Sequence, residues 1–190
     1  MIQTSTKPVG ACCGGSSGAR GTEAVPTRPA PVDGRFELVD HFGKPVNERN
    51  FGVRHLLVFF GFSHCAVVCP RELAKLGAAL ERLGPLAERI QALYITVDPQ
   101  RDDPSTMQAY VARYPGGCVG LTGTPEQVEA AKNAYRVFAK PVQDASAPGG
   151  YVVPHTAFAY LMAPGGRYVT HLSEALDVDA VVERLRQHIA

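Results

Sequence analysis

Two cysteines, Cys65 and Cys69, lie four residues apart and have the residue type and spacing for chemistry. A thiolate attacks disulfides and binds soft metal ions, so the pair can exist as a disulfide or as two metal-binding sulfurs. Buried cysteines also serve as small apolar side chains. We regard that third interpretation as the weaker one, because both residues lie in a segment that leads from a strand into a helix, where reactive thiols are favoured.

Two sulfurs rarely complete a metal site, so a third ligand is expected from elsewhere in the chain, and histidine is the natural candidate. Of the six histidines, His155 follows Pro154 and begins an apolar segment that ends at Met162. Its position leaves two alternatives open, a third ligand or an ordinary histidine at the edge of a strand. The remaining histidines are three expected to be solvated (His41, His55 and His188) and two weaker candidates (His64 and His171).

The elements that must position the cysteines can be read from the segments on either side of them. Residues 56–60 form an unbroken apolar run, which predicts a buried strand. Pro70 stands where a helix can begin, since proline is tolerated in the first turn. Leucines at helical spacing then predict a helix that ends near Gly84: they are Leu73, Leu76, Leu80 and Leu83.

The rest of the chain alternates between predicted strands and helices. Residues 36–46 predict a hairpin with a glycine turn, and residues 90–97 predict a second buried strand. Asp103 and Thr124 each precede a proline and predict helix N-caps, the second helix carrying an apolar face to Phe138. Residues 118–121 suggest a short strand, 140–150 an exposed loop, 155–170 a strand and hairpin, and 178–189 a final amphipathic helix. The pattern predicts an α/β, thioredoxin-like fold with a central mixed sheet flanked by helices and an N-terminal hairpin.

Composition predicts one folded domain. The chain has 190 residues, 45% of them hydrophobic, and a formal net charge of +1. Residues 1–34 are rich in Gly, Ser, Thr and Pro and predict a disordered tail or linker that carries Cys12 and Cys13, while residues 35–190 form the domain. No basic stripe indicates a nucleic-acid partner, no apolar run approaches the roughly 18 residues of a membrane span, and no apolar signal-peptide core is seen.

Four ordered segments resemble the signatures of the SCO/SenC family of copper chaperones for cytochrome c oxidase assembly. The first, residues 61–70, contains the cysteine pair. The others are residues 96–104 (Thr-Val-Asp-Pro-Gln-Arg-Asp-Asp-Pro), residues 120–125 and residues 151–166. The resemblance covers residues 35 to 189 with the order and spacing of the signatures kept.

This resemblance implies a thioredoxin-like fold and a copper site made by Cys65, Cys69 and His155. It implies Cu(I), with Cu(II) as a second state to consider, and delivery to the dinuclear copper centre of subunit II of cytochrome c oxidase or to another copper-accepting protein. It further implies a protein at the membrane that faces the periplasm or the mitochondrial intermembrane space, although no anchor is seen in this sequence. We expect a monomer that acts as a metallochaperone rather than as an enzyme.

The sequence departs from the family pattern at two places beside the proposed ligands. The family usually has Pro-Asp after the first cysteine, where this chain has Ala66-Val67, and Asp before the ligand histidine, where this chain has Pro154. Such neighbouring carboxylates tune metal affinity. A thiol–disulfide oxidoreductase that uses Cys65 and Cys69 as a redox pair is therefore the alternative function, and a binding module with a static disulfide is a third. Cys118 is expected to be structural in each case.

Overall fold

The computed structural model describes residues 31–189. The predicted tail over residues 1–34, with Cys12 and Cys13, lies outside the described residues except for its last four. Within those four, Asp33 N–H donates to the Ala134 carbonyl at 2.9 Å, and the Gly34 carbonyl accepts from the Tyr135 hydroxyl at 3.1 Å. Asp33 and Gly34, at the end of the predicted tail, therefore contact the domain. None of the helices in the described part is both long and apolar enough to cross a membrane.

The fold is a seven-stranded mixed sheet in the order β2-β1-β5-β4-β3-β8-β9, with helices on both faces. Its strands are β1 (Glu37–Asp40), β2 (Pro45–Asn47), β3 (His55–Gly61), β4 (Ile90–Thr96), β5 (Val119–Thr122), β8 (Ala159–Ala163) and β9 (Arg167–Leu172). A separate small hairpin pairs β6 (Val142–Gln143) with β7 (Tyr151–Val152). The helices are α1 (Val68–Leu83), α2 (Pro104–Val111), α3 (Pro125–Tyr135) and α4 (Val178–Ile189).

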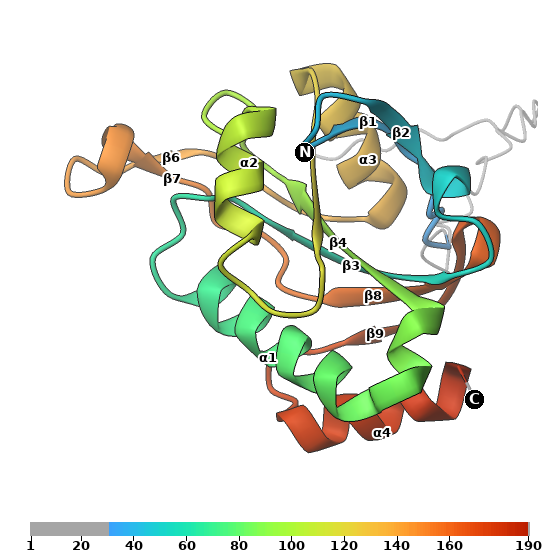
Figure 1. The fold of residues 1–190 in the computed structure, drawn as a ribbon. Helices are drawn as coiled ribbons and strands as arrows, with labels where there is room; N and C mark the ends of the chain where they lie inside the picture. Colours follow the sequence, from blue (N-terminus) through green and yellow to red (C-terminus); the bar gives the residue numbers. More distant parts are fainter. Residues whose placement is uncertain (1–30, 190) are drawn as a thin grey trace, which may run out of the picture. The chain divides into compact units, whose positions relative to one another are not determined.

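The central strand β3 divides the protein into two apolar cores because its side chains alternate between the two faces of the sheet. Leu57 and Phe59 pack with α1, α2 and α4 on one face. Leu56, Val58 and Phe60 pack with α3 on the other. Figure 1 shows α1 and α4 side by side on the first of these faces. Burial on both faces explains why residues 56–60 are apolar without interruption.

Strand pairing brings three loops to one edge of the sheet. Strand β3 runs parallel to β4, with Gly61 opposite Thr96, so the chain leaves both strands at the same end. Strand β8 runs antiparallel to β3, with Ala159 opposite Phe59, so the chain enters β8 at that end. The loop with the cysteines, the loop that follows β4 and the segment that contains His155 therefore meet at this edge.

The predicted caps and hairpins are confirmed. The Asp103 carboxylate accepts from the Thr106 N–H at 2.7 Å at the start of α2, and Thr124 forms a capping box with Gln127 at the start of α3. Strands β1 and β2 pair as the N-terminal hairpin, and β8 and β9 as the later one. The thioredoxin-like mixed sheet flanked by helices is the fold that the sequence predicts.

Helix α1 begins at Val68, so Pro70 lies in its first turn, as predicted. Two predicted boundaries are wrong. Helix α3 ends at Tyr135 because Arg136 adopts a left-handed conformation (φ 59°), which leaves Phe138 exposed beyond the helix. Strand β8 begins at Ala159 rather than at His155, and His155 instead forms an isolated bridge with Ala139.

Candidate metal centre

The two cysteines lie where β3 gives way to α1. Cys65 is half-buried in the connecting loop, and Cys69 is fully buried in the first turn of α1. The Cys69 backbone N–H donates to Cys65 Sγ at 3.4 Å. Together with Cys118, both are free thiols among the described residues. This is the arrangement that the sequence predicts, a loop sulfur held against the start of a helix.

The two sulfurs hold their protons unequally. The Cys69 thiol donates to the Cys65 sulfur, and backbone N–H groups of residues 67–69 point at the same atom; together these lower the pKa of Cys65 to about 5. The same interaction with Cys65, followed by burial, raises the pKa of Cys69 far above its ordinary value. Cys65 is therefore the thiolate at neutral pH and Cys69 the thiol that stabilises it.

His155 lies against the buried sulfur. Its Nε2 is 3.7 Å from Cys69 Sγ, and its Nδ1 lies 2.8 Å from the Val153 carbonyl oxygen. A carbonyl only accepts, so Nδ1 carries the ring proton and Nε2 presents its lone pair to the sulfur. The Phe62 ring packs edge-on against the imidazole, with 5.8 Å between ring centroids. The ring is thus fixed in the tautomer that a metal ligand requires.

The sulfur and nitrogen have the separation of two ligands on one small metal ion. Metal–sulfur bonds of about 2.3 Å and metal–nitrogen bonds of about 2.0 Å, at angles between roughly 110° and 120°, separate the two ligand atoms by about 3.5–3.7 Å. The observed distance is 3.7 Å. Among residues 31–189, no group of three or more His, Cys, Asp or Glu side chains already has metal-binding geometry. Of the three predicted ligands, Cys69 contacts both Cys65 and His155. Cys65 Sγ accepts the Cys69 backbone N–H at the start of α1.

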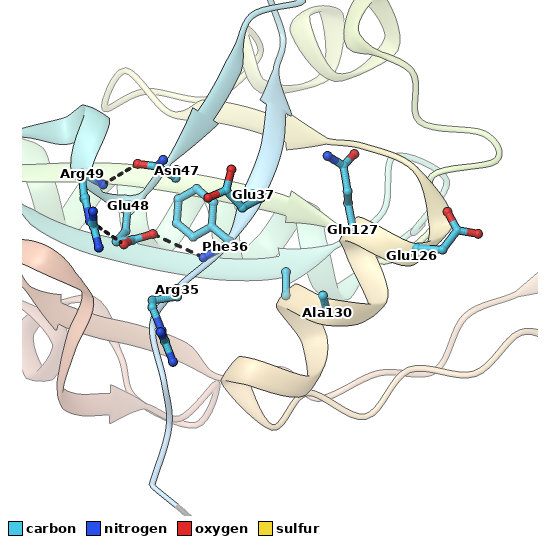
Figure 2. A pocket seen from close by; sticks show the side chains of 10 residues that line it. Arg35, Phe36, Glu37, Asn47, Glu48, Arg49, Glu126, Gln127 and Ala130 are labelled. Atoms are coloured by element: carbon cyan, nitrogen blue, oxygen red, sulfur yellow. Dashed lines mark hydrogen bonds and ion pairs between the residues drawn. The ribbon is translucent and has the colours of Figure 1, made fainter.

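A pocket of about 560 Å³ opens over the site, and both Cys65 and His155 line it. Its walls are mainly apolar and come from Phe62, Val68 and the segments 146–148 and 152–154. Cys69 does not line the pocket, so an incoming ion meets Cys65 and His155 first. A second pocket, of about 590 Å³, lies between the β1–β2 hairpin and α3 (Figure 2). The described residues that line this second pocket include no cysteine or histidine, so it offers no soft metal ligand.

A buried carboxylate anchors the cysteine loop to the end of β4. Asp102 is fully buried and accepts from the Ser63 N–H at 3.0 Å, the Ser63 hydroxyl at 2.5 Å and the Thr96 hydroxyl at 2.7 Å. Asp98, Arg101 and Asp102 follow the predicted second strand, where the sequence allows two roles for them, loop anchoring or partner recognition. The contacts of Asp102 favour anchoring, because its two oxygens are directed at the loop and strand of its own chain.

Arg101 joins the same loop to the segment that precedes His155. Its Nε donates to the buried Asp98 carboxylate, which also accepts from the Tyr151 hydroxyl at 2.9 Å. Its Nη1 donates to the carbonyls of Pro148 at 2.8 Å and Tyr151 at 3.3 Å, and its guanidinium lies 3.7 Å from the Tyr151 ring centroid. This brace crosses about fifty residues of sequence, so no local pattern could predict it.

Of the other histidines, only His64 lines the pocket over the site, where it is exposed and pairs with the Ser63 hydroxyl at 2.9 Å. His171 lies against Phe158, with 4.8 Å between centroids and the rings tilted by 44°. His41 is not simply solvated as predicted, since its Nδ1 accepts from the Gly120 N–H at 2.9 Å. His188 is exposed on α4. Cys118 packs against the core beside α1, and burial raises its pKa to about 12.

Comparison with protein families matches residues 24–190 to the family described as SCO1/SenC. The chain belongs to the SCO1/SenC family. The mouse protein named SCO2 homolog, mitochondrial, is 38% identical over 174 residues, which cover 89% of this chain and 66% of the mouse protein. Yeast SCO1, mitochondrial, is 35% identical over 159 residues, covering 83% of this chain and 54% of the yeast protein. The chain thus spans between half and two thirds of these SCO relatives.

Solved structures of SCO proteins share the fold. Bradyrhizobium japonicum ScoI, described with copper bound, gives a TM-score of 0.74 at 34% identity and covers 83% of this chain and 99% of its own. Yeast Sco1, also described with copper bound, gives 0.72 at 35% identity and covers 84% and 89%. The thioredoxin-like fold expected from the resemblance is therefore the SCO fold.

The unequal protonation of the cysteines predicts a distinct pH profile of alkylation. Among the three cysteines of residues 31–189, iodoacetamide should modify Cys65 first, with reactivity that is present at neutral pH and is lost as the pH falls through a midpoint near 5. Cys69→Ala removes the main donor to Cys65, so the midpoint should rise toward the ordinary thiol value of about 8.5. Mass spectrometry of quenched samples gives the rates. Cys118→Ala is the control, and an identical midpoint in Cys69→Ala would refute the assignment.

The contacts of Arg101 with Asp98, Pro148 and Tyr151 predict that a positive charge alone at this position does not hold residues 148–151 against the loop after β4. Arg101→Lys keeps the charge but loses the planar fork that reaches a carboxylate and two carbonyls, and should cost about 1–3 kcal/mol of local stability. Hydrogen exchange should accelerate in peptides from residues 142–155 and remain unchanged in α4. Arg113→Lys is a matched control, because Arg113 also lies over a tyrosine ring, at 4.5 Å from Tyr110. Equal protection of residues 142–155 in both variants would contradict the brace.

Proposed function

We propose that this SCO1/SenC protein is a metallochaperone that carries Cu(I) on Cys65, Cys69 and His155 and delivers it during assembly of cytochrome c oxidase. One observation carries the proposal. The Nε2 lone pair of His155 faces Cys69 Sγ at 3.7 Å, with the ring proton held on Nδ1 by a carbonyl. Two thiolate sulfurs and one imidazole nitrogen form a soft donor set that suits Cu(I).

The protonation states suggest an order of binding. Cys65, half-exposed and already a thiolate, meets the ion at the pocket. The bound metal ion neutralises the charge of the Cys65 thiolate, which then accepts a hydrogen bond from the Cys69 thiol less strongly. The pKa of Cys69 falls, and the thiol releases its proton to solvent. Cys69 and the prepared Nε2 of His155 complete the site, with Cys65 Sγ moving away from the helix N-terminus. Uptake of Cu(I) thus releases about one proton, and binding tightens as the pH rises.

Delivery requires that the ligands be reachable by another protein. Cys65 and His155 line the open pocket, while Val67, between the cysteines, is 66% exposed. An acceptor sulfur can therefore replace one ligand while the buried Cys69 keeps its bond. We propose the dinuclear copper centre of oxidase subunit II as the acceptor. Similarity to mitochondrial SCO proteins of mouse and yeast supports a site of action on the intermembrane-space or periplasmic side of a membrane.

A second candidate is a thiol–disulfide oxidoreductase acting on partner cysteines. The half-exposed Cys65 thiolate favours it, since a low-pKa thiol attacks a disulfide and the neighbouring Cys69 resolves the mixed disulfide. This function needs both sulfurs but not the lone pair of His155. The two functions are therefore separated by His155→Ala, which should weaken copper binding and leave thiol exchange intact.

Anaerobic titration of the reduced protein with Cu(I) against a competing chelator tests the proposal. The wild type should bind one ion per chain. Cys65→Ala and Cys69→Ala should abolish competitive binding, and His155→Ala, which removes a ligand, should weaken it by at least the roughly 10–100-fold that loss of an outer-shell partner produces. His188→Ala, which removes an exposed histidine from α4, should bind as the wild type does.

Two outcomes would contradict the proposal. A wild type that cannot compete with the chelator would transfer the assignment to thiol exchange. Equal affinity of His155→Ala and His188→Ala would remove the histidine from the site.

A further inference from the structure

Tyr94 on β4 carries a buried hydroxyl whose role nothing described so far explains. The side chain is fully buried among α1, β3 and α2 residues, and its hydroxyl has no hydrogen-bond partner among residues 31–189. An unpaired buried hydroxyl destabilises the fold, and a phenylalanine at the same position would avoid that cost. Such a group calls for a specific explanation.

The hydroxyl borders the sulfur of Cys69. Gly61, the last residue of β3, would place a Cβ 2.6 Å from Cys69 Sγ and even closer to the Tyr94 hydroxyl oxygen. Both atoms therefore adjoin the small space that a side chain at Gly61 would occupy. Gly61 does not have a positive φ, so space rather than backbone conformation requires a glycine there. The absence of a side chain lets the hydroxyl and the sulfur face each other.

Two aromatic rings are the other neighbours of the Tyr94 ring, and of these Tyr110 also brings a hydroxyl close to that of Tyr94. The Phe59 ring, at 6.0 Å between centroids, has no polar atom. Tyr110 stacks on Tyr94 at 5.4 Å with an interplanar angle of 22°, and its own buried hydroxyl is also without a partner. The Cys69 sulfur is a weak acceptor while it is a thiol, but a thiolate accepts strongly.

We infer that Tyr94 is a further residue of the copper site, whose hydroxyl donates a hydrogen bond to the Cys69 thiolate when Cu(I) is bound. This inference rests on the proposed function. The hydrogen bond withdraws electron density from the sulfur, which stabilises Cu(I) relative to Cu(II). Tyr94 donates this hydrogen bond from inside the apolar core. The carboxylates that the family usually has beside the ligands are absent from this chain, which has Ala66-Val67 and Pro154 at those positions.

Tyr94→Phe tests the inference because it removes the oxygen and keeps the ring. In the copper-loaded protein, Cu(I) affinity should fall several-fold. In the Cu(II) form, the sulfur-to-copper charge-transfer band should move to longer wavelength, since the sulfur orbitals rise in energy when the donor is lost. The copper-free variant should unfold at the same or a higher urea concentration than the wild type, which is the opposite of the effect of losing a structural hydrogen bond.

Tyr110→Phe is the matched control. It removes the neighbouring unpaired hydroxyl without touching the space at Gly61, and its band position and affinity should match those of the wild type. Wild-type copper binding combined with an unchanged band and affinity in Tyr94→Phe overturns the inference and leaves the proposed function in place. A wild type that binds no copper overturns both, and a copper-free Tyr94→Phe that unfolds more readily assigns the hydroxyl to the fold instead.

Discussion

The antiparallel pairing of β8 with β3, beside the parallel pairing of β3 with β4, is the constraint on which the site depends. The chain leaves β3 and enters β8 at the same edge of the sheet, so Cys65 and Cys69 meet His155 across almost ninety residues of sequence. The end of β4 reaches that edge too, and its loop supplies Asp102 and Arg101. Strand pairing determines which loops meet at this edge. The side chains of Asp102 and Arg101 hold the cysteine loop and the segment before His155 against the loop that follows β4.

Two buried carboxylates then do different structural tasks in that third loop. Asp102 fixes the cysteine loop through Ser63, while Asp98 orients Arg101, which holds the segment ahead of His155. Each carboxylate is satisfied by several donors, which is the condition under which a buried charge is tolerated. The cysteine side and the histidine side of the site are thus tied to one loop. Cys65 and His155, both partly exposed, line the pocket from which an ion or an acceptor approaches.

Local sequence signals predict most of the elements. The apolar run at 56–60, the caps at Asp103 and Thr124 and the place of the two thiols after β3 are confirmed, because each depends on neighbours within a few residues. The assignment of the metal ligands stays a prediction. Phe138 was misplaced because helical periodicity cannot reveal that Arg136 adopts a positive φ. The start of β8 was misplaced because pairing with β3, not local propensity, decides it. The sequence singles out Arg101 but cannot predict its contacts with residues 148–151, and it gives no signal for Tyr94, because both roles arise from contacts between distant segments.

X-ray absorption spectroscopy of the Cu(I)-loaded protein tests the central claim most directly, because it counts the atoms bound to copper. The account predicts two sulfur neighbours at about 2.3 Å and one nitrogen neighbour at about 2.0 Å. In His155→Ala the nitrogen should disappear while both sulfurs remain. A coordination shell of sulfur alone in the wild type, or a nitrogen that persists in His155→Ala, would contradict the assignment of Cys65, Cys69 and His155 as the copper ligands.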